Sequence, residues 1–177
     1  MNKSFYVETI APDIGLIYFD LPGEKVNKFS TPVMEELSVL VDDIRTKTEW
    51  KAVIFASRKP ATFIAGADIR EIQDVTAEDH GYRLALRGQE LFQKIENLPL
   101  IVVAAINGTC LGGGLEFALA CHFRVVSDHE KTSLGLPETK LGILPGFGGT
   151  QRLPKLVGIA TAIEWITAGK TVDGKKA

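Results

Sequence analysis

The chain has 177 residues, of which 45% are hydrophobic and 24% charged, and its formal net charge is −2. That length suits one domain with a substantial core, and the charge excludes the basic footprint of a nucleic-acid-binding protein. The longest apolar runs, such as LPLIVVAAI at 98–106, are too short to cross a bilayer, and no signal peptide precedes the first strand-like run. A cytoplasmic protein without a membrane span is expected.

The first third of the chain alternates strand-like and helical patterns. The runs FYVETI (5–10) and IGLIYFD (14–20), separated by a short turn, predict a hairpin. Ser30 and Pro32 then open a predicted helix over 32–46. Its apolar side chains recur at helical spacing and are Met34, Leu37, Val41 and Ile44. A buried strand is predicted at 51–57 and a loop at 58–68.

The remaining elements continue that alternation, which predicts an α/β fold with largely parallel strands. A helix is predicted over 77–97, a buried strand over 100–106, a short helix after the glycine run, and a strand over 123–127. The Gly- and Pro-rich stretch 135–154 is predicted to be mostly loop, and 160–170 a helix that stops at Gly169. The last residues, TVDGKKA, resemble the start of a further element.

Cysteine and histidine give little sign of metal or redox chemistry. Cys110 and Cys121 lie in apolar surroundings without a C-x-x-C pair, so they are interpreted as buried, reduced thiols. The three histidines are interpreted as surface or local hydrogen-bonding residues: His80, His122 and His129. No metal site is predicted, because no cluster has ligand spacing.

The stretch NGTCLGGGLEFALACH (107–122) joins a buried strand to a short apolar helix through three glycines. The first backbone N–H groups of a helix lack internal partners and attract negative charge. Glycine lets a substrate carbonyl approach the backbone closely. The N–H groups around Gly113 are therefore candidates for an oxyanion hole.

Two carboxylates are candidates for acid–base chemistry. Glu116 sits in the first helical turn among apolar residues, where burial and the helix N-terminus act on its charge in opposite directions. It could equally well only complement the helix dipole. Glu138 follows Pro137 and precedes several glycines; taken alone, it would more often be a solvated loop residue.

A third segment, FIAGADI (63–69), is a small-residue turn after the strand at 51–57. The backbone N–H of Ala67 is a candidate for a second oxyanion donor. Asp68 is better interpreted as a helix cap than as a catalytic carboxylate.

These three segments resemble signature blocks of the crotonase, or enoyl-CoA hydratase/isomerase, superfamily. The blocks are FIAGADI, AAINGTCLGGGLEFALACHFRV and LGLPETKLGILPGFGGTQRLPKLVG, which occur in the family's order. Together with PGEKVNKFS, the stretch TCLGGGLE is most similar to the N-terminal hydratase part of the multifunctional fatty-acid oxidation α subunit.

The resemblance implies roles for individual residues. The N–H groups of Ala67 and Gly113 would hold the thioester oxygen, while Glu116 and Glu138 would hold a water molecule and move protons. Further substrate-binding positions would be Ala65, Gly66, Asp68, Gly112, Gly114, Pro137 and Gly146. No cofactor is implied, because coenzyme A is part of the substrate.

The resemblance also implies a fold and an assembly. The expected fold is a crotonase-like spiral of ββα units over residues 1–177, an N-terminal fragment that lacks the family's C-terminal helices. The expected full-length protein is a homotrimer or larger complex, with a thiolase subunit as a further partner. The implied reaction is hydration of trans-2-enoyl-CoA in fatty-acid β-oxidation.

Two other functions stay open. A Δ3-Δ2-enoyl-CoA isomerase would shuttle a proton on one carboxylate, in the same site, without adding water. A non-catalytic acyl-CoA-binding or assembly module would bind without turnover, and the presence of two carboxylates argues against it. Spacing excludes a Rossmann dinucleotide site at GFGGTQ and a serine-hydrolase elbow.

Overall fold

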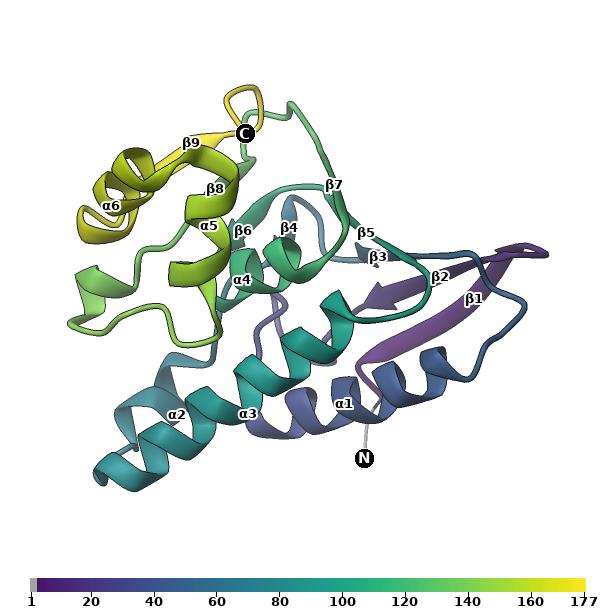
Figure 1. The fold of residues 1–177 in the computed structure, drawn as a ribbon, viewed down its shortest axis with the longest axis horizontal. Helices are drawn as coiled ribbons and strands as arrows, with labels where there is room; N and C mark the ends of the chain where they lie inside the picture. Colours follow the sequence, from purple (N-terminus) through teal and green to yellow (C-terminus); the bar gives the residue numbers. More distant parts are fainter. Residues whose placement is uncertain (1–2) are drawn as a thin grey trace.

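Two sheets and a set of helices make up the computed structural model, which describes residues 3–177 (Figure 1). Over that range the larger sheet has the order β1-β2-β3-β5-β7. Its strands are β1 (Phe5–Ala11), β2 (Ile14–Phe19), β3 (Ala52–Ser57), β5 (Ile101–Ile106) and β7 (Phe123–Val126). Only the β1–β2 hairpin in this sheet is antiparallel, as predicted.

The smaller sheet has the order β4-β6-β8-β9. Its short strands are β4 (Thr62–Ile64), β6 (Thr109–Leu111), β8 (Ser133–Gly135) and β9 (Thr171–Asp173). β4, β6 and β8 pair in parallel, while β9 runs antiparallel to β8. The prediction of an unbroken loop over 58–68 is therefore wrong, because β4 lies within it, and the C-terminal TVDGKKA begins as a strand.

The helices in the described part of the chain are α1 (Thr31–Arg45), α2 (Ile69–Gln73), α3 (Glu78–Glu96), α4 (Gly113–Ala120), the 3-10 helix η1 (Glu138–Leu141), α5 (Gly149–Val157) and α6 (Ile159–Thr167). Helix α1 follows the β1–β2 hairpin of the larger sheet, and most later helices follow a pair of strands, one from each sheet. β3 and β4 lead to α2 and α3, β5 and β6 to α4, and β7 and β8 to η1 and α5. This repetition confirms the predicted spiral of ββα units.

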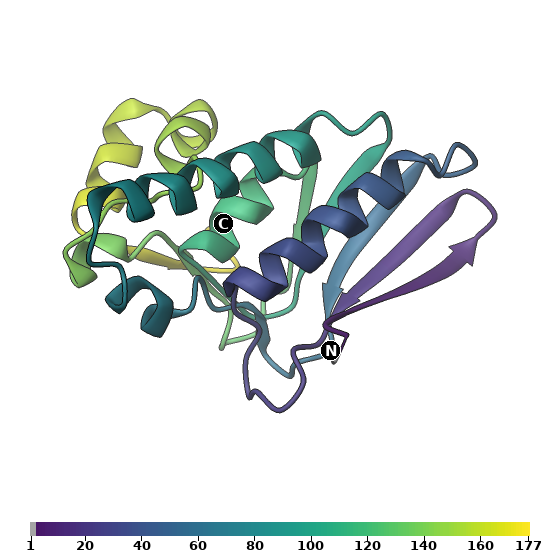
Figure 2. The same ribbon diagram turned by 90° about the horizontal axis from the view of Figure 1, so that it is seen from below.

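Helices α1 and α3 run side by side across one face of the larger sheet (Figure 2). Val33, Leu37, Val41 and Ile44 turn from α1 into the core, whereas the predicted core residue Met34 is only partly buried. Phenylalanines fill the space between sheet and helices; Phe117 of α4 contacts the rings of Phe29, Phe55, Phe63 and Phe92.

The stretch 135–154 differs most from its prediction. η1 and the first part of α5 lie within it, although its glycines and prolines favoured loop. Helix α5 packs against α4 and α6, and this tertiary contact stabilises a helix that contains Pro154. Burial against neighbouring elements here outweighs low intrinsic helix propensity.

Candidate active site

Helix α4 lies at the centre of the molecule, and each of its residues is buried. Its N-cap is Gly112, whose φ of 51° is rarely adopted by other residues. Glu116 follows one turn later, and only 1% of its surface is exposed. From the sequence alone, Glu116 could equally have served only to complement the helix dipole. A carboxylate with that role alone would not need to be buried.

The Glu116 carboxylate is held by the loop that precedes α5. Its Oε1 accepts hydrogen bonds from the backbone N–H of Phe147, at 2.8 Å, and of Gly149, at 2.7 Å. Both bonds end on the same oxygen, so Oε2 is the oxygen left for a further ligand. Gly149 must be a glycine, because a Cβ there would lie 3.0 Å from Glu116 Oε1.

The pKa of the Glu116 carboxyl lies well above that of an ordinary glutamate. Burial raises the pKa of this carboxyl to about 7, and the charge of Glu138 also raises it. The N–H groups of Gly149 and Phe147 and the charge of Arg152 act in the opposite direction. A carboxyl with a pKa near 7 can gain or lose a proton at physiological pH, which suits acid–base chemistry.

Glu138 opens helix η1, directly after Pro137, and is not the solvated loop residue that the segment alone would favour. Only 8% of its surface is exposed, and burial raises the pKa of its carboxyl. Its Oε2 is buried without a hydrogen-bond partner among residues 3–177. Its Oε1 lies 2.9 Å from the position that a Cβ on Gly112 would occupy, so any side chain there would displace the carboxylate.

The candidate oxyanion donors also lie together. A Cβ on Gly113 would be 3.6 Å from the Ala67 nitrogen, so the two amides border one small space. Within the described chain, no hydrogen-bond partner is found for either N–H. Free backbone donors beside two buried carboxylates can stabilise a developing negative charge on oxygen.

A parallel bridge holds the Ala67 peptide in place. Phe29 donates its N–H to Gly66 O at 2.8 Å, and Phe29 O accepts from Asp68 N at 2.7 Å. These bonds use the neighbours of Ala67 and leave its own N–H free. Gly66 has a φ of 119°, which glycine adopts without strain.

Asp68 caps α2, as predicted, by accepting from Arg70 N at 3.0 Å. Its other oxygen pairs with Lys28 at 3.0 Å, which keeps its pKa low. Asp68 is thus tied into local structure, and its predicted contact with substrate stays a prediction.

The other predicted binding residues fall into two groups. Gly112 and Pro137 border the carboxylates, and Gly146 lies in the loop before Phe147. Gly114 packs against β4, where a Cβ would meet Ile64 O at 2.3 Å, and Ala65 donates its N–H to Asn27 O at 2.8 Å. Their roles toward a substrate stay predictions.

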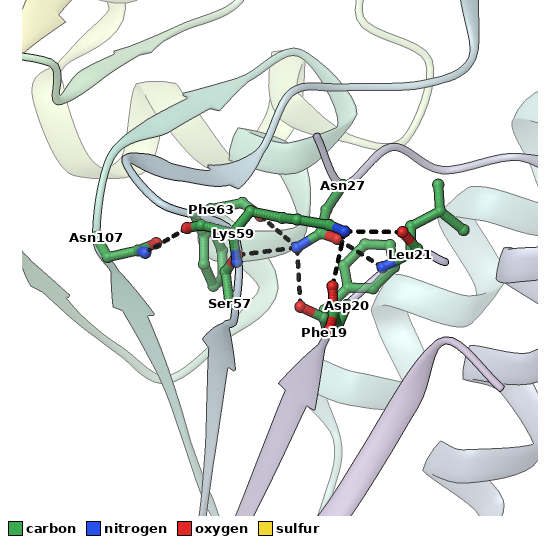
Figure 3. Close-up of polar contacts among 8 residues, drawn as sticks. All are labelled: Phe19, Asp20, Leu21, Asn27, Ser57, Lys59, Phe63 and Asn107. Atoms are coloured by element: carbon green, nitrogen blue, oxygen red, sulfur yellow. Dashed lines mark hydrogen bonds and ion pairs between the residues drawn. The ribbon is translucent and has the colours of Figure 1, made fainter. Parts of the chain in front are cut away.

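Asn27 is a supporting residue that the sequence analysis missed (Figure 3). It is fully buried, and its side-chain hydrogen bonds are with Leu21 N (2.9 Å), Phe19 O (2.9 Å), Ser57 Oγ (2.9 Å) and Phe63 O (3.2 Å). It thereby joins β2, β3 and β4 where they end, beside the Ala67 turn. Asn27 lies in the PGEKVNKFS stretch, but a turn-rich sequence does not indicate which of its polar residues is buried.

The cysteines and histidines lie outside the site. Cys110 and Cys121 are buried, free thiols. His122 and His129 are both exposed; His129 accepts a local hydrogen bond from Lys131 N, whereas His122 accepts from Val102 N of β5, which is distant in the sequence. Across residues 3–177, no three His, Cys, Asp or Glu side chains gather as metal ligands would. In the same range, the helices are too short or too polar to cross a membrane.

The spiral of ββα units is the crotonase-like fold, and comparison with known proteins gives the family. Residues 9–177 match the enoyl-CoA hydratase/isomerase family. An enoyl-CoA hydratase from Bacillus anthracis is 35% identical to this chain, with a TM-score of 0.90 over 99% of it. One from Geobacillus kaustophilus is 34% identical, with a TM-score of 0.92 over 100% of this chain. Pseudomonas aeruginosa DspI is 31% identical, with a TM-score of 0.90 over 99% of this chain and 70% of its own.

The chain therefore belongs to the enoyl-CoA hydratase/isomerase family. It spans 66% and 65% of the length of the two hydratases. The family match covers the blocks that carry Ala67, Gly113, Glu116 and Glu138.

Proposed function

We propose that this chain carries an enoyl-CoA hydratase site, which adds water to a trans-2-enoyl-CoA and yields a 3-hydroxyacyl-CoA. One observation supports this most directly. Two buried carboxylates, Glu116 and Glu138, adjoin the backbone amides of Ala67 and Gly113, which have no hydrogen-bond partner among residues 3–177. Hydration needs this combination, because a proton must be removed from water while another is added to carbon.

In the proposed reaction, the Ala67 and Gly113 N–H groups bind the thioester oxygen and draw electron density from the conjugated alkene. Glu116 takes a proton from water as the water oxygen bonds to the β-carbon. The resulting enolate receives a proton at the α-carbon from Glu138. Oxyanion donors of this kind each contribute roughly 3 kcal/mol to transition-state stabilisation.

Hydrogen bonding supports this division of roles. Two N–H groups donate to Glu116, which stabilises its ionised form and suits a base. Burial favours the protonated form of both carboxyls, so it does not separate their roles. Glu138 differs from Glu116 in that its Oε2 receives no donor within residues 3–177, which suits an acid. Repulsion between the two carboxylates further favours a state in which the pair shares one proton near neutral pH.

Turnover of crotonyl-CoA and of a long-chain 2-enoyl-CoA, followed in Glu116→Gln and Glu138→Gln, tests the proposal. Each substitution keeps the shape of the side chain and removes its acid–base function, so each should lower kcat by about 10²–10⁴-fold. Circular dichroism should show an unchanged fold. Either variant with near wild-type turnover would remove that residue from the mechanism.

Isomerisation of a 3-enoyl-CoA in the same site is the second candidate. The unpartnered Glu138 oxygen favours it, because one carboxylate with a mobile proton is enough to move a double bond. Product analysis with 3-enoyl-CoA and 2-enoyl-CoA separates the two activities. Binding of both thioesters without any product would instead favour a non-catalytic acyl-CoA-binding module.

We further propose that the site serves fatty-acid β-oxidation in the cytoplasm, as part of a trimer or larger assembly that includes a thiolase. The support is the resemblance of PGEKVNKFS and TCLGGGLE to the multifunctional α subunit. Sedimentation of the protein purified from its source, with and without thiolase activity in the same fraction, checks the assembly.

A further inference from the structure

The loop over 145–149 supplies both amides that hold Glu116 Oε1, so whatever fixes this loop also fixes the carboxylate. Besides α4, which carries Glu116, helix α3 is in contact with this loop. Three independent contacts join them: one apolar contact and two polar ones.

The apolar contact is between Phe147 and Gly88. Gly88 is buried in the middle of α3, and a Cβ there would lie 2.2 Å from the Phe147 ring. The ring therefore rests directly on the helix backbone, with its edge toward Phe92 at a centroid distance of 5.5 Å. Glycine inside a helix costs about 1 kcal/mol relative to alanine, so the absent side chain needs a reason.

The polar contacts lie on either side of that ring. Gln89 of α3 donates its side-chain N–H to Gly146 O at 2.8 Å. Arg152 donates to Phe147 O at 3.0 Å and is itself held by Glu96 of α3, at 2.9 Å. The backbone carbonyls before and at Phe147 are thus tied to α3, while the Phe147 N–H points the other way, to Glu116.

The same ring also borders the oxyanion site. A Cβ on Gly113 would lie 3.3 Å from the ring atoms of Phe147. A movement of Phe147 would therefore alter the surroundings of Glu116 and of the Gly113 amide together.

We propose that Gly88 and Phe147 are a positioning pair: the ring, seated on the bare backbone of α3, aims two loop amides at Glu116 Oε1 and leaves Oε2 for the reacting water. This inference rests on the proposed function, because it assigns Glu116 as the base. Neither Gly88 nor the Phe147 ring is given a chemical step of its own.

Gly88→Ala tests the pair. The added methyl group overlaps the Phe147 ring, so the ring must shift, and we expect the hydrogen bond from the Phe147 N–H to Glu116 to be distorted with it. We expect kcat for hydration to fall roughly 10- to 100-fold, the scale at which small misplacements act. Overlap with a buried ring also costs stability, so kcat is compared under conditions in which both proteins stay folded.

A pH profile distinguishes positioning from a merely structural effect. The two N–H donors lower the Glu116 pKa, so their withdrawal should raise that pKa further. The acid limb of the pH–rate profile should then move to higher pH. Glu138 of η1 and Arg152 of α5 also act on this carboxyl. Carbon-13 NMR of the Glu116 carboxyl reports the same shift without turnover.

Two further variants complete the design. In a Phe147→Ala background the added methyl has no ring to displace, so Gly88→Ala should cause no additional loss there. Gly81→Ala is the matched control, because it changes the same helix but meets only Val75, at 3.3 Å. It should leave turnover and the Glu116 titration unchanged.

The outcomes separate the two proposals. An unchanged Glu116 titration in Gly88→Ala, or an equal loss in both backgrounds, overturns the positioning pair and leaves the hydratase proposal standing. Absence of turnover in the wild type, with the Glu116 titration still shifted by Gly88→Ala, supports the pair and overturns the hydratase proposal.

Discussion

Glu116 carries a cost of stability that depends on pH. Its pKa of about 7 in the folded chain lies above the ordinary 4.5, so the folded state keeps a proton that the unfolded state has lost. Below pH 4.5 Glu116 therefore costs the folded state little, and the free energy of unfolding falls as the pH rises from 4.5 to about 7. The difference corresponds to roughly 3 kcal/mol above pH 7.

Glu116→Gln should remove that cost. The amide oxygen can still accept from Phe147 and Gly149, so we expect the free energy of unfolding to rise by about 1–3 kcal/mol at pH 8. At pH 4.5, where Glu116 is protonated in the folded state and half protonated in the unfolded state, the gain should nearly vanish. Urea unfolding at both pH values measures it.

The exposed Glu164 provides the control for this experiment. It pairs with Lys170 at the surface, and its pKa is lowered rather than raised. Glu164→Gln should therefore give no gain at pH 8. An equal gain from Glu116→Gln at pH 4.5 and pH 8 would contradict burial as the source of the raised pKa.

Gly113 shows how a single backbone position separates activity from stability. It is the first residue of α4, and a Cβ there would be in ordinary contact with the Ala67 nitrogen but tight against Phe147. Gly113→Val places branched carbon in the space between the two amides. We expect kcat to fall about 10²–10³-fold, as for loss of one oxyanion donor.

Calorimetry with a non-hydrolysable enoyl-CoA analogue should show weaker binding to Gly113→Val. Thermal unfolding should change little by comparison, because the helix backbone tolerates valine at its first turn. Equal affinity of the wild type and the variant for the analogue would count against the oxyanion role of this amide.

At the scale of elements, Asn27 holds the ends of three strands together. Asn27→Ala would leave Leu21 N and the carbonyls of Phe19 and Phe63 without their side-chain partner in a fully buried place. Each unsatisfied group costs about 1–3 kcal/mol, so we expect a loss of roughly 3 kcal/mol or more. Ser57→Ala removes one of these bonds and should cost about 1 kcal/mol.

Chemical denaturation of the two variants checks this difference. Because Asn27 also lies beside Ala65 through its backbone carbonyl, hydrogen exchange should rise first in the turn over 65–68. Similar losses in both variants would show that Asn27 is no more than one contact among many.

The elements that could be predicted from sequence are those long enough to show a period. The hairpin, α1, α3 and the strands β3, β5 and β7 have clear patterns and form where expected. β4 and β6 have three residues each, too few for any period, and α2 is a single capped turn. α5 was missed because its glycines and Pro154 favour loop, while its stability comes from packing on α4 and α6.

The residues of the site also divide into those that the sequence indicates and those that it does not. Glu116 stands out because a carboxylate in an apolar helix is unusual, whereas Glu138 taken alone resembles a solvated loop residue and gained its role from the family resemblance. Gly88 and Phe147 give no such signal, since a helix glycine and a loop aromatic are each ordinary alone. Their meaning depends on a contact between segments far apart in the chain, which local patterns do not contain.

At the scale of the whole molecule, apolar side chains gather on α5 and α6 at the surface. Leu156, Ile159 and Ile163 are 55%, 70% and 57% exposed. Ile159 and Ile163 are one helical turn apart, so they form a stripe on one side of α6. Exposed apolar patches of this kind promote association in water.

We therefore expect this 177-residue chain to self-associate irregularly, and less so when it is extended to the length of its relatives. Ile159→Ser with Ile163→Ser should reduce the association without lowering thermal stability, because neither side chain reaches the core. Leu153→Ser, on the buried side of α5, is the contrasting variant and should unfold the protein more easily. Light scattering across a concentration series, with hydratase assays on the short and extended chains, measures the effect. If the short chain stayed monomeric and as active as the extended one, the apolar stripe would be an ordinary surface, and the additional length would contribute nothing to this site.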